Sequence, residues 1–227
     1  MIRIGAFVYP GMDQLDFTGP FEVLSRLDDA SFFVVWKTLD PIRDVQGLAF
    51  LPDTRMADAP PFDVLIVPGG PGQEALMYDE PVLAFVRSSA TSARFVLSVC
   101  TGALLCGAAG LLHGKRATTH WASIHLLEHF GATPVDERVV VDGNFVSSAG
   151  VTSGIDGALR VAALAQGRAV AERIALAIEY APEPPFGFGT PRHSRPEIVA
   201  AVREALSPIV KARTNTASDY RKARDGS

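Results

Sequence analysis

The chain of 227 residues is predicted to form a largely parallel β-sheet with helices on both faces. Short apolar runs alternate with helix-like segments almost throughout, which is the order of βαβ units. Residues 95–99 are mostly apolar, as in a strand that is buried on both faces. Residues 101–109 are rich in Ala and Leu, which suits a helix packed closely on a sheet.

The first strand and helix are expected to place one acidic residue at the edge of the sheet. Residues 2–9 are mostly apolar and are followed by Pro and Gly at 10–11, which end the strand. Thr18 or Gly19 before Pro20 predicts a helix start and a helix to about Leu27. Asp16 then falls in the connection, at the edge where doubly wound sheets gather their sites. The alternative is that Asp16 caps the helix.

The remaining elements follow in order along the chain. Strands are expected at 32–38, 63–67, 95–99, 139–141 and 145–147, with short strands or a hairpin within 40–56. Helices are expected at 81–92, 101–109, 122–130, 153–166, 169–180 and 196–212. A Pro- and Gly-rich linker spans 181–196, and the last fifteen residues are polar and are expected to fray.

Cys100 lies at the junction between the strand 95–99 and the helix that follows. A sharp turn there lifts the side chain out of the core and toward backbone N–H groups that favour a thiolate. Gly102 allows the backbone to turn tightly, so the stretch has the form of a nucleophile elbow. The alternative for a cysteine in an apolar run is packing as a small hydrophobic side chain. Cys106, inside the helix, is assigned to packing.

Two further features could serve chemistry at the same edge of the sheet. The loop 68–72 contains Gly69 and Gly70, whose backbone N–H groups could bind an oxyanion. The alternative is a tight turn, and a dinucleotide-binding G-x-G-x-x-G is absent. His120 precedes a helix and is a candidate base, although a histidine there can equally be a hydrogen-bonded structural residue.

Composition excludes several classes of partner. The formal net charge of −4 gives no indication of nucleic acid or an anionic membrane as a partner. No apolar run reaches the length of a transmembrane helix, and the N-terminus lacks the pattern of a secretory signal. The two cysteines form no CxxC pair, which argues against a disulfide framework and a zinc site. We therefore expect a cytoplasmic protein without a metal.

Five stretches together resemble the DJ-1/PfpI superfamily. They are 15–20 (LDFTGP), 67–70 (VPGG), 98–102 (SVCTG), 116–121 (RATTHW) and 150–156 (GVTSGID). The resemblance covers roughly 1–185 and implies a flavodoxin-like three-layer α/β/α sandwich with the cysteine on a nucleophile elbow. It leaves 186–227 as the end of the linker, a C-terminal helix and a polar tail, packed on the same domain or on a dimer partner.

Within the superfamily the chain is most similar to the isocyanide hydratases, including the stretch 179–186 (EYAPEPPF). This similarity implies hydration of a small isocyanide to an N-substituted formamide, with no cofactor or metal, by a homodimer. It implies Cys100 as the nucleophile that forms a thioimidate, Asp16 as general acid and base, and Thr101 as the residue that orients substrate or water. Further substrate-orienting residues would be Gly69, Gly70, Val151 and Thr152.

At two positions this chain differs from many members of the superfamily, and both differences bear on which reaction is expected. PfpI-type peptidases place a histidine directly after the cysteine, where this chain has Thr101, which argues against a Cys–His peptidase dyad. Many members, DJ-1 included, place Glu after the first strand, where this chain has Asp16 as the hydratases do. His120 matches a position near the cysteine in DJ-1 and remains a possible auxiliary residue.

Two alternative functions follow from the same motifs. One is glyoxalase- or deglycase-like chemistry on a 2-oxoaldehyde, with Cys100 as nucleophile and His120 as base. The other is a non-catalytic thiol sensor related to the amidase-like half of AraC-type regulators. Those regulators carry a helix-turn-helix domain after this region, where this chain has only a short helix and a polar tail, which argues against DNA binding.

Overall fold

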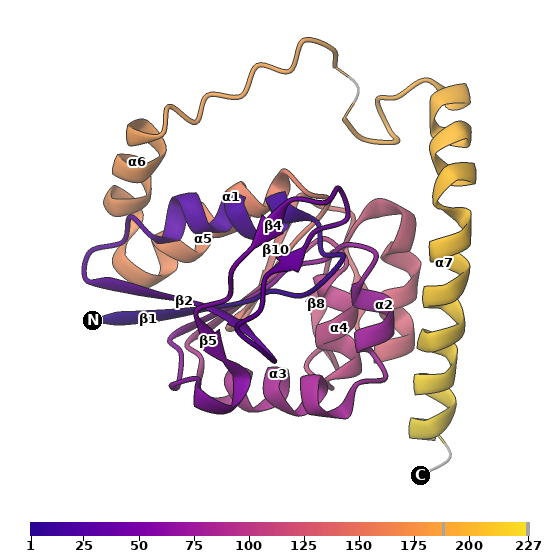
Figure 1. Ribbon diagram of the computed structural model, residues 1–227. Coiled ribbons are helices and arrows are strands. Elements are labelled where there is room, and N and C mark those ends of the chain that lie inside the picture. Colours follow the sequence, from indigo (N-terminus) through magenta and orange to yellow (C-terminus); the bar gives the residue numbers. More distant parts are fainter. Residues whose placement is uncertain (188, 226–227) are drawn as a thin grey trace.

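The computed structural model describes residues 1–187 and 189–225, and it has a mostly parallel sheet between two layers of helices (Figure 1). Within these residues the central sheet has seven strands in the order β10-β11-β7-β6-β1-β2-β5. Only the β10–β11 pair is antiparallel in this sheet of the described chain. The predicted fold class, a flavodoxin-like α/β/α sandwich, is confirmed.

The strands are short and mostly buried. The central sheet contains β1 (Ile2–Phe7), β2 (Ala30–Trp36), β5 (Thr54–Arg55), β6 (Val64–Val67), β7 (Phe95–Val99), β10 (Val139–Asp142) and β11 (Phe145–Ser148). Two small pairs lie outside it, β3 (Ile42–Arg43) with β4 (Ala49–Phe50) and β8 (Arg116–Ala117) with β9 (Thr133–Pro134). The expected hairpin at 139–147 is therefore present, and the stretch 40–56 does form short strands.

Helices cover both faces of the sheet. They are α1 (Gln14–Leu24), α2 (Gln73–Leu76), α3 (Glu80–Ser92), α4 (Gly102–Ala108), α5 (Ser153–Gln166), α6 (Arg168–Ala177) and α7 (Pro196–Asp225), with 3₁₀ helices η1 (Met56–Asp58) and η2 (Trp121–Phe130). The α1 and α5 helices pack on one face, and α3 and α4 lie on the other (Figure 1). The strand order reverses between β1 and β6, so the loops after β1, β6 and β7 meet at one edge.

The start of α1 differs from the sequence prediction. Asp13 accepts a hydrogen bond from Leu15 N (3.1 Å) and caps a helix that begins at Gln14. Pro20 lies inside this helix rather than at its start. Asp16 therefore occupies the first turn of α1, and the capping role considered for it belongs to Asp13.

The C-terminal helix also differs from the prediction, because α7 runs through the segment that was expected to fray. Its second half carries a buried stripe that includes Arg213, Thr216 and Ala217. Tyr220 continues this stripe, and its ring lies 5.0 Å from that of Phe130 in η2. These side chains are spaced three or four residues apart, so one face of α7 packs against η2, α2 and α4. The polar composition of the last fifteen residues gave no indication of this packed face.

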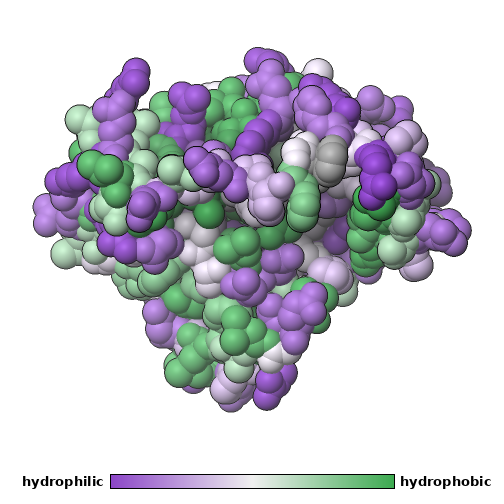
Figure 2. Space-filling model, turned by 90° about the horizontal axis from the view of Figure 1, so that it is seen from above, coloured by the Kyte–Doolittle hydropathy of each residue, from purple (hydrophilic) through white to green (hydrophobic). Residues whose placement is uncertain are grey.

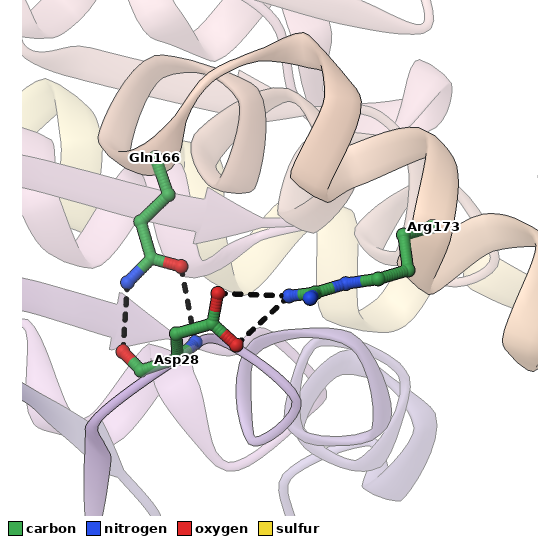
Figure 3. Close-up of polar contacts among 3 residues, drawn as sticks. All are labelled: Asp28, Gln166 and Arg173. Carbon is green, nitrogen blue, oxygen red and sulfur yellow. Dashed lines mark hydrogen bonds and ion pairs between the residues drawn. The ribbon is translucent and has the colours of Figure 1, made fainter.

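A long connection joins α6 to α7. In Figure 1 it arches over the α1–α5 layer from one end of the molecule to the other. The helix α6 and the end of α5 are held by polar contacts around Asp28, which Figure 3 shows in close-up. Gln166 exchanges two hydrogen bonds with the Asp28 backbone (3.0 and 2.8 Å), and Arg173 Nη2 lies 2.8 Å from Asp28 Oδ1. No helix in the described part of the chain is long and apolar enough to cross a membrane.

Gly102→Ala is expected to destabilise the protein by about 3 kcal/mol, because it forces atoms into a junction without free space. A Cβ at Gly102 would lie 2.1 Å from Val67 O and 2.7 Å from Pro68 O. Urea denaturation would measure the change, with Gly187→Ala as the control because a Cβ there meets no atom within 4 Å. A Gly102→Ala variant as stable as the control would contradict this packing of α4 against β6.

Candidate active site

The residues proposed from the sequence converge where β1, β6, β7 and β11 end. Asp16 comes from the first turn of α1, and Gly69 and Gly70 from the loop after β6. Cys100 and Thr101 follow β7 directly. The segment after β11 supplies further site residues, among them Val151. The parallel strands thus bring together side chains that are far apart in the sequence.

Cys100 occupies a strained backbone conformation at the turn from β7 to α4. Its φ of 54° lies in the left-handed region, which costs a non-glycine residue about 1–3 kcal/mol. The Cys100 N–H donates to Ser148 O (3.0 Å), and the Cys100 carbonyl accepts from Thr119 Oγ1 (2.6 Å). These bonds hold the turn, as a nucleophile elbow requires.

The Cys100 thiol is almost buried, with 6% of the residue exposed. Burial raises the pKa of this thiol well above its usual range, and the neighbouring Asp16 carboxylate raises it further. Hydrogen bonds from the backbone N–H groups of Val151 and Thr101 lower the pKa, as does the positive charge of Arg213. The raising effects are larger, so the resting side chain is a thiol.

Asp16 is completely buried beside this thiol. Its Oδ2 accepts a hydrogen bond from Gly69 N (2.9 Å), and its Oδ1 has no nitrogen or oxygen partner. Burial raises the pKa of Asp16 to about 8, and Asp13 contributes to the increase. The hydrogen bonds from Gly69 and Cys100 oppose it. Asp16 is therefore largely a neutral carboxylic acid at pH 7, able to give up a proton.

Thr101 and the two glycines form a tight hydrogen-bonded unit. Gly70 N donates to Thr101 Oγ1 (3.1 Å), while Gly69 N donates to Asp16. A Cβ at Gly69 would lie 2.5 Å from Thr101 N, so only glycine allows this approach. Both N–H groups that were expected to be free for an oxyanion are engaged with protein atoms in this structure. Their contact with a substrate stays a prediction.

Arg213 is a site residue that the sequence reasoning missed. It reaches the site from α7, with 6% of the residue exposed, and its Nη2 donates to Gly70 O (3.0 Å) and Thr101 Oγ1 (3.3 Å). The signal that could have found it is the spacing of Arg213, Thr216, Ala217 and Tyr220 on one helical face.

His120 lies at the rim of the site and caps η2. Its Nδ1 accepts a hydrogen bond from Ala122 N (3.3 Å), and its ring lies 5.5 Å from that of Trp121. Burial lowers the pKa of His120 to about 4, and Arg213 adds to this effect. His120 is thus neutral at pH 7, with its proton assigned to Nε2, and it is a weak base.

A cleft of about 720 Å³ lies next to the elbow. Thr119, which donates to the Cys100 carbonyl, and Val151, whose N–H contacts the Cys100 thiol, both line it. Thr152 also lines the cleft, but its Oγ1 accepts from Arg138 Nη2 (3.2 Å). A small molecule in this cleft would approach Cys100 from the side of Val151.

The described residues contain no group of three or more His, Cys, Asp or Glu side chains arranged to hold a metal ion. The polar groups that converge on Cys100 are instead a carboxyl group, a hydroxyl group, a guanidinium and backbone amides. Such a set can exchange protons with a bound molecule and form hydrogen bonds to it.

Comparison with known proteins places this site in a family. The model described as the DJ-1/PfpI family matches residues 3–164. A Pseudomonas putida protein named isonitrile hydratase is 48% identical over 213 residues, covering 94% of this chain and 93% of that protein. The crystal structure of a ThiJ/PfpI family protein from Pseudomonas syringae is 37% identical and has a TM-score of 0.93, covering 95% of this chain and 90% of the other. Deglycase TK1284 from Thermococcus kodakarensis is 34% identical over 40% of this chain and 55% of its own length.

Asp16→Asn is expected to gain stability over the parent protein as the pH rises. The folded pKa of about 8 lies above 3.8, the usual value for an aspartic acid in an unfolded chain, so between these values the unfolded carboxyl group ionises while the folded one stays protonated. The parent then loses about 1.4 kcal/mol of unfolding free energy per pH unit in this window. Denaturation at several pH values would measure it, with the exposed Asp40→Asn as control. Parallel pH profiles for the parent and Asp16→Asn would contradict a buried neutral carboxyl group.

Proposed function

Because the chain belongs to the DJ-1/PfpI family, we propose that it hydrates isocyanides, converting R–N≡C to R–NH–CHO. The observation that carries the proposal is the convergence of the Cys100 thiol with the buried carboxylic acid of Asp16. The relative from Pseudomonas putida, with 48% identity over nearly the whole chain, is named isonitrile hydratase. The enzyme would be a lyase that acts without a metal or cofactor.

The substrate makes an unusual demand that this pair of groups can meet. The terminal carbon of an isocyanide must receive both a nucleophile and a proton. A thiol and a carboxyl group that face one point can supply the two together. Neither group needs a charge at rest, which suits their burial.

In the first step, the sulfur of Cys100 attacks the terminal carbon of the isocyanide. Asp16 gives its proton to the same carbon and takes the proton of the thiol. A C–S bond and a C–H bond form, the S–H bond breaks, and the product is the thioimidate R–N=CH–S–Cys100. Asp16 ends the step protonated, as it began.

In the second step, water adds to the thioimidate carbon. The carboxylic acid of Asp16 gives its proton to the imidate nitrogen and takes a proton from the attacking water, while Thr101 orients this nitrogen or the water. When the C–S bond later breaks, Asp16 gives its proton to the sulfur and takes the proton of the new hydroxyl group. The tetrahedral R–NH–CH(OH)–S–Cys100 then loses the thiol and releases R–NH–CHO. The enzyme regains the state in which it started.

We also infer that the chain acts as a homodimer in the cytoplasm, where Cys100 stays reduced. Large apolar side chains are exposed at the end of α6 and in the linker that follows it. Among them, 83% of Leu176 and 74% of Phe186 is exposed. Seen from the linker side, hydrophobic patches alternate with hydrophilic ones (Figure 2). Burial against a second copy would remove such surface from water. Light scattering of the purified protein would test this, and a monomer at micromolar concentration would contradict it.

Cys100→Ala is expected to abolish formamide production from an aryl isocyanide, since no thioimidate can form. Product can be followed by NMR, with Cys106→Ala as the matched control because that buried thiol has no role in the mechanism. The control should keep activity within about threefold of the parent, in line with a small core truncation. Formamide from Cys100→Ala would exclude the covalent route. Turnover of methylglyoxal in place of isocyanide by the parent would favour the deglycase alternative.

The kcat/KM for the isocyanide is expected to fall as the pH rises above about 8, the pKa to which burial raises Asp16. Above this value the carboxyl group is ionised in the free enzyme and cannot protonate the carbon. A pH–rate profile would measure this limb, and Asp16→Asn should retain less than about 1% of the parent activity, since proton transfer contributes 10²–10⁴-fold. Parent-like activity in Asp16→Asn would remove Asp16 from the chemistry.

A further inference from the structure

We propose that Arg213 is a positioning residue for this reaction, which holds the Thr101 hydroxyl as a hydrogen-bond donor and places a positive charge at the elbow that carries Cys100. The inference rests on the proposed function, because it assigns Thr101 a definite role in the second step. It adds a residue from the C-terminal helix to the chemistry of the elbow.

The hydrogen bonds around Thr101 allow its hydroxyl group to act toward a ligand only as a donor. A hydroxyl oxygen has two lone pairs and one proton. Gly70 N (3.1 Å) and Arg213 Nη2 (3.3 Å) both donate to Thr101 Oγ1, so both lone pairs are used. The O–H proton is then the remaining hydrogen-bonding group, and Thr101 can contact a ligand only as a donor.

The second step requires a hydrogen-bond donor at the thioimidate nitrogen. The thioimidate nitrogen carries a lone pair and must gain a proton as water adds to the neighbouring carbon. A hydroxyl group that can only donate would polarise this nitrogen, while a freely rotating hydroxyl group could also accept a hydrogen bond from water. The hydrogen bond from Arg213 therefore selects one of the two orientations considered for Thr101.

The guanidinium is fixed by its own contacts. Its Nη2 donates to Gly70 O (3.0 Å) as well as to Thr101, and the helix α7 buries the side chain. Its Nε is buried without a hydrogen-bond partner. A lysine could supply the charge, but not the planar fork that reaches two acceptors with a fixed geometry.

The charge of Arg213 acts on the groups that face it. They include Cys100 after β7, Tyr9 after β1, Glu74 in α2 and His120 before η2. At Cys100 it lowers the pKa of the thiol, as the backbone N–H groups of Val151 and Thr101 also do, whereas burial and an ionised Asp16 raise that pKa. Arg213 thus joins these backbone groups in stabilising negative charge on the sulfur as the S–H bond breaks.

The first test follows the reactivity of Cys100 without any isocyanide. The alkylation rate of Cys100 by iodoacetamide is measured at a fixed pH in a Cys106→Ala background, because this rate follows the small thiolate fraction of a thiol whose pKa is raised well above its usual range. Arg213→Met should lower the rate several-fold, because loss of the cation reduces the thiolate fraction. Arg213→Lys should restore most of the rate, and Lys211→Ala, an exposed position on the same helix, should leave the rate unchanged. An unchanged rate in Arg213→Met would overturn the role assigned to the charge.

The second test asks whether Arg213 acts through Thr101. Arg213→Lys should lower kcat about tenfold with little change in KM, because charge remains but the hydroxyl orientation is lost. In a Thr101→Val background the same substitution should have almost no further effect. Fully additive losses would overturn the positioning role. Arg213→Lys decides this point even where Arg213→Met does not fold, as judged by thermal melting.

The two tests separate this inference from the proposed function. If the parent hydrates no isocyanide but Arg213→Met still slows the alkylation of Cys100, the proposed function fails while the effect of Arg213 on the thiol stands. If the parent hydrates isocyanides and the effects of Arg213→Lys and Thr101→Val on kcat are additive, the proposed function stands and the positioning role fails.

Discussion

The left-handed backbone conformation of Cys100 is the constraint on which the site depends. With a φ of 54°, this residue turns the chain from β7 into α4 and directs the thiol toward Asp16 and Val151. Hydrogen bonds to its N–H and carbonyl come from β11 and from Thr119, so neighbouring elements hold a turn that the residue itself disfavours. The absence of a Cβ at Gly69 and Gly102 lets the β6 loop approach this turn.

Burial then sets the protonation states of the groups that this turn brings together. Desolvation of Cys100 and Asp16 outweighs the backbone N–H groups and the Arg213 charge that favour their ionised forms. The resting pair is therefore neutral, and negative charge on sulfur arises only as a proton moves away. A substrate that accepts both a proton and a nucleophile at one carbon suits such a pair better than one that needs a standing thiolate.

Local sequence was sufficient to predict the sheet, the elbow and the meeting of Asp16, Cys100 and Thr101. Each of these follows a buried strand, and parallel strands end at a common edge, so their proximity follows from topology. The start of α1 was wrong because Pro20 is a frequent first-turn residue, whereas here Asp13 supplies the cap. Arg213 was missed because it lies in a polar segment, where the helical spacing of Arg213, Thr216, Ala217 and Tyr220 marks a packed face but does not show which site that face meets. Its role depends on where α7 packs, which is a tertiary property.

The groups of the site are divided between the core that the family model matches and the C-terminal helix. The match to the DJ-1/PfpI family spans residues 3–164, which contain the thiol, the carboxyl group and the hydroxyl group. Arg213 lies outside that span and enters from α7, after a long exposed linker. The matched core therefore supplies the nucleophile, the acid and the hydroxyl group, while α7 supplies the cation that fixes one hydrogen-bond direction at Thr101. A donor at that position favours substrates that develop a basic nitrogen next to the attacked carbon, as an isocyanide does once sulfur has added.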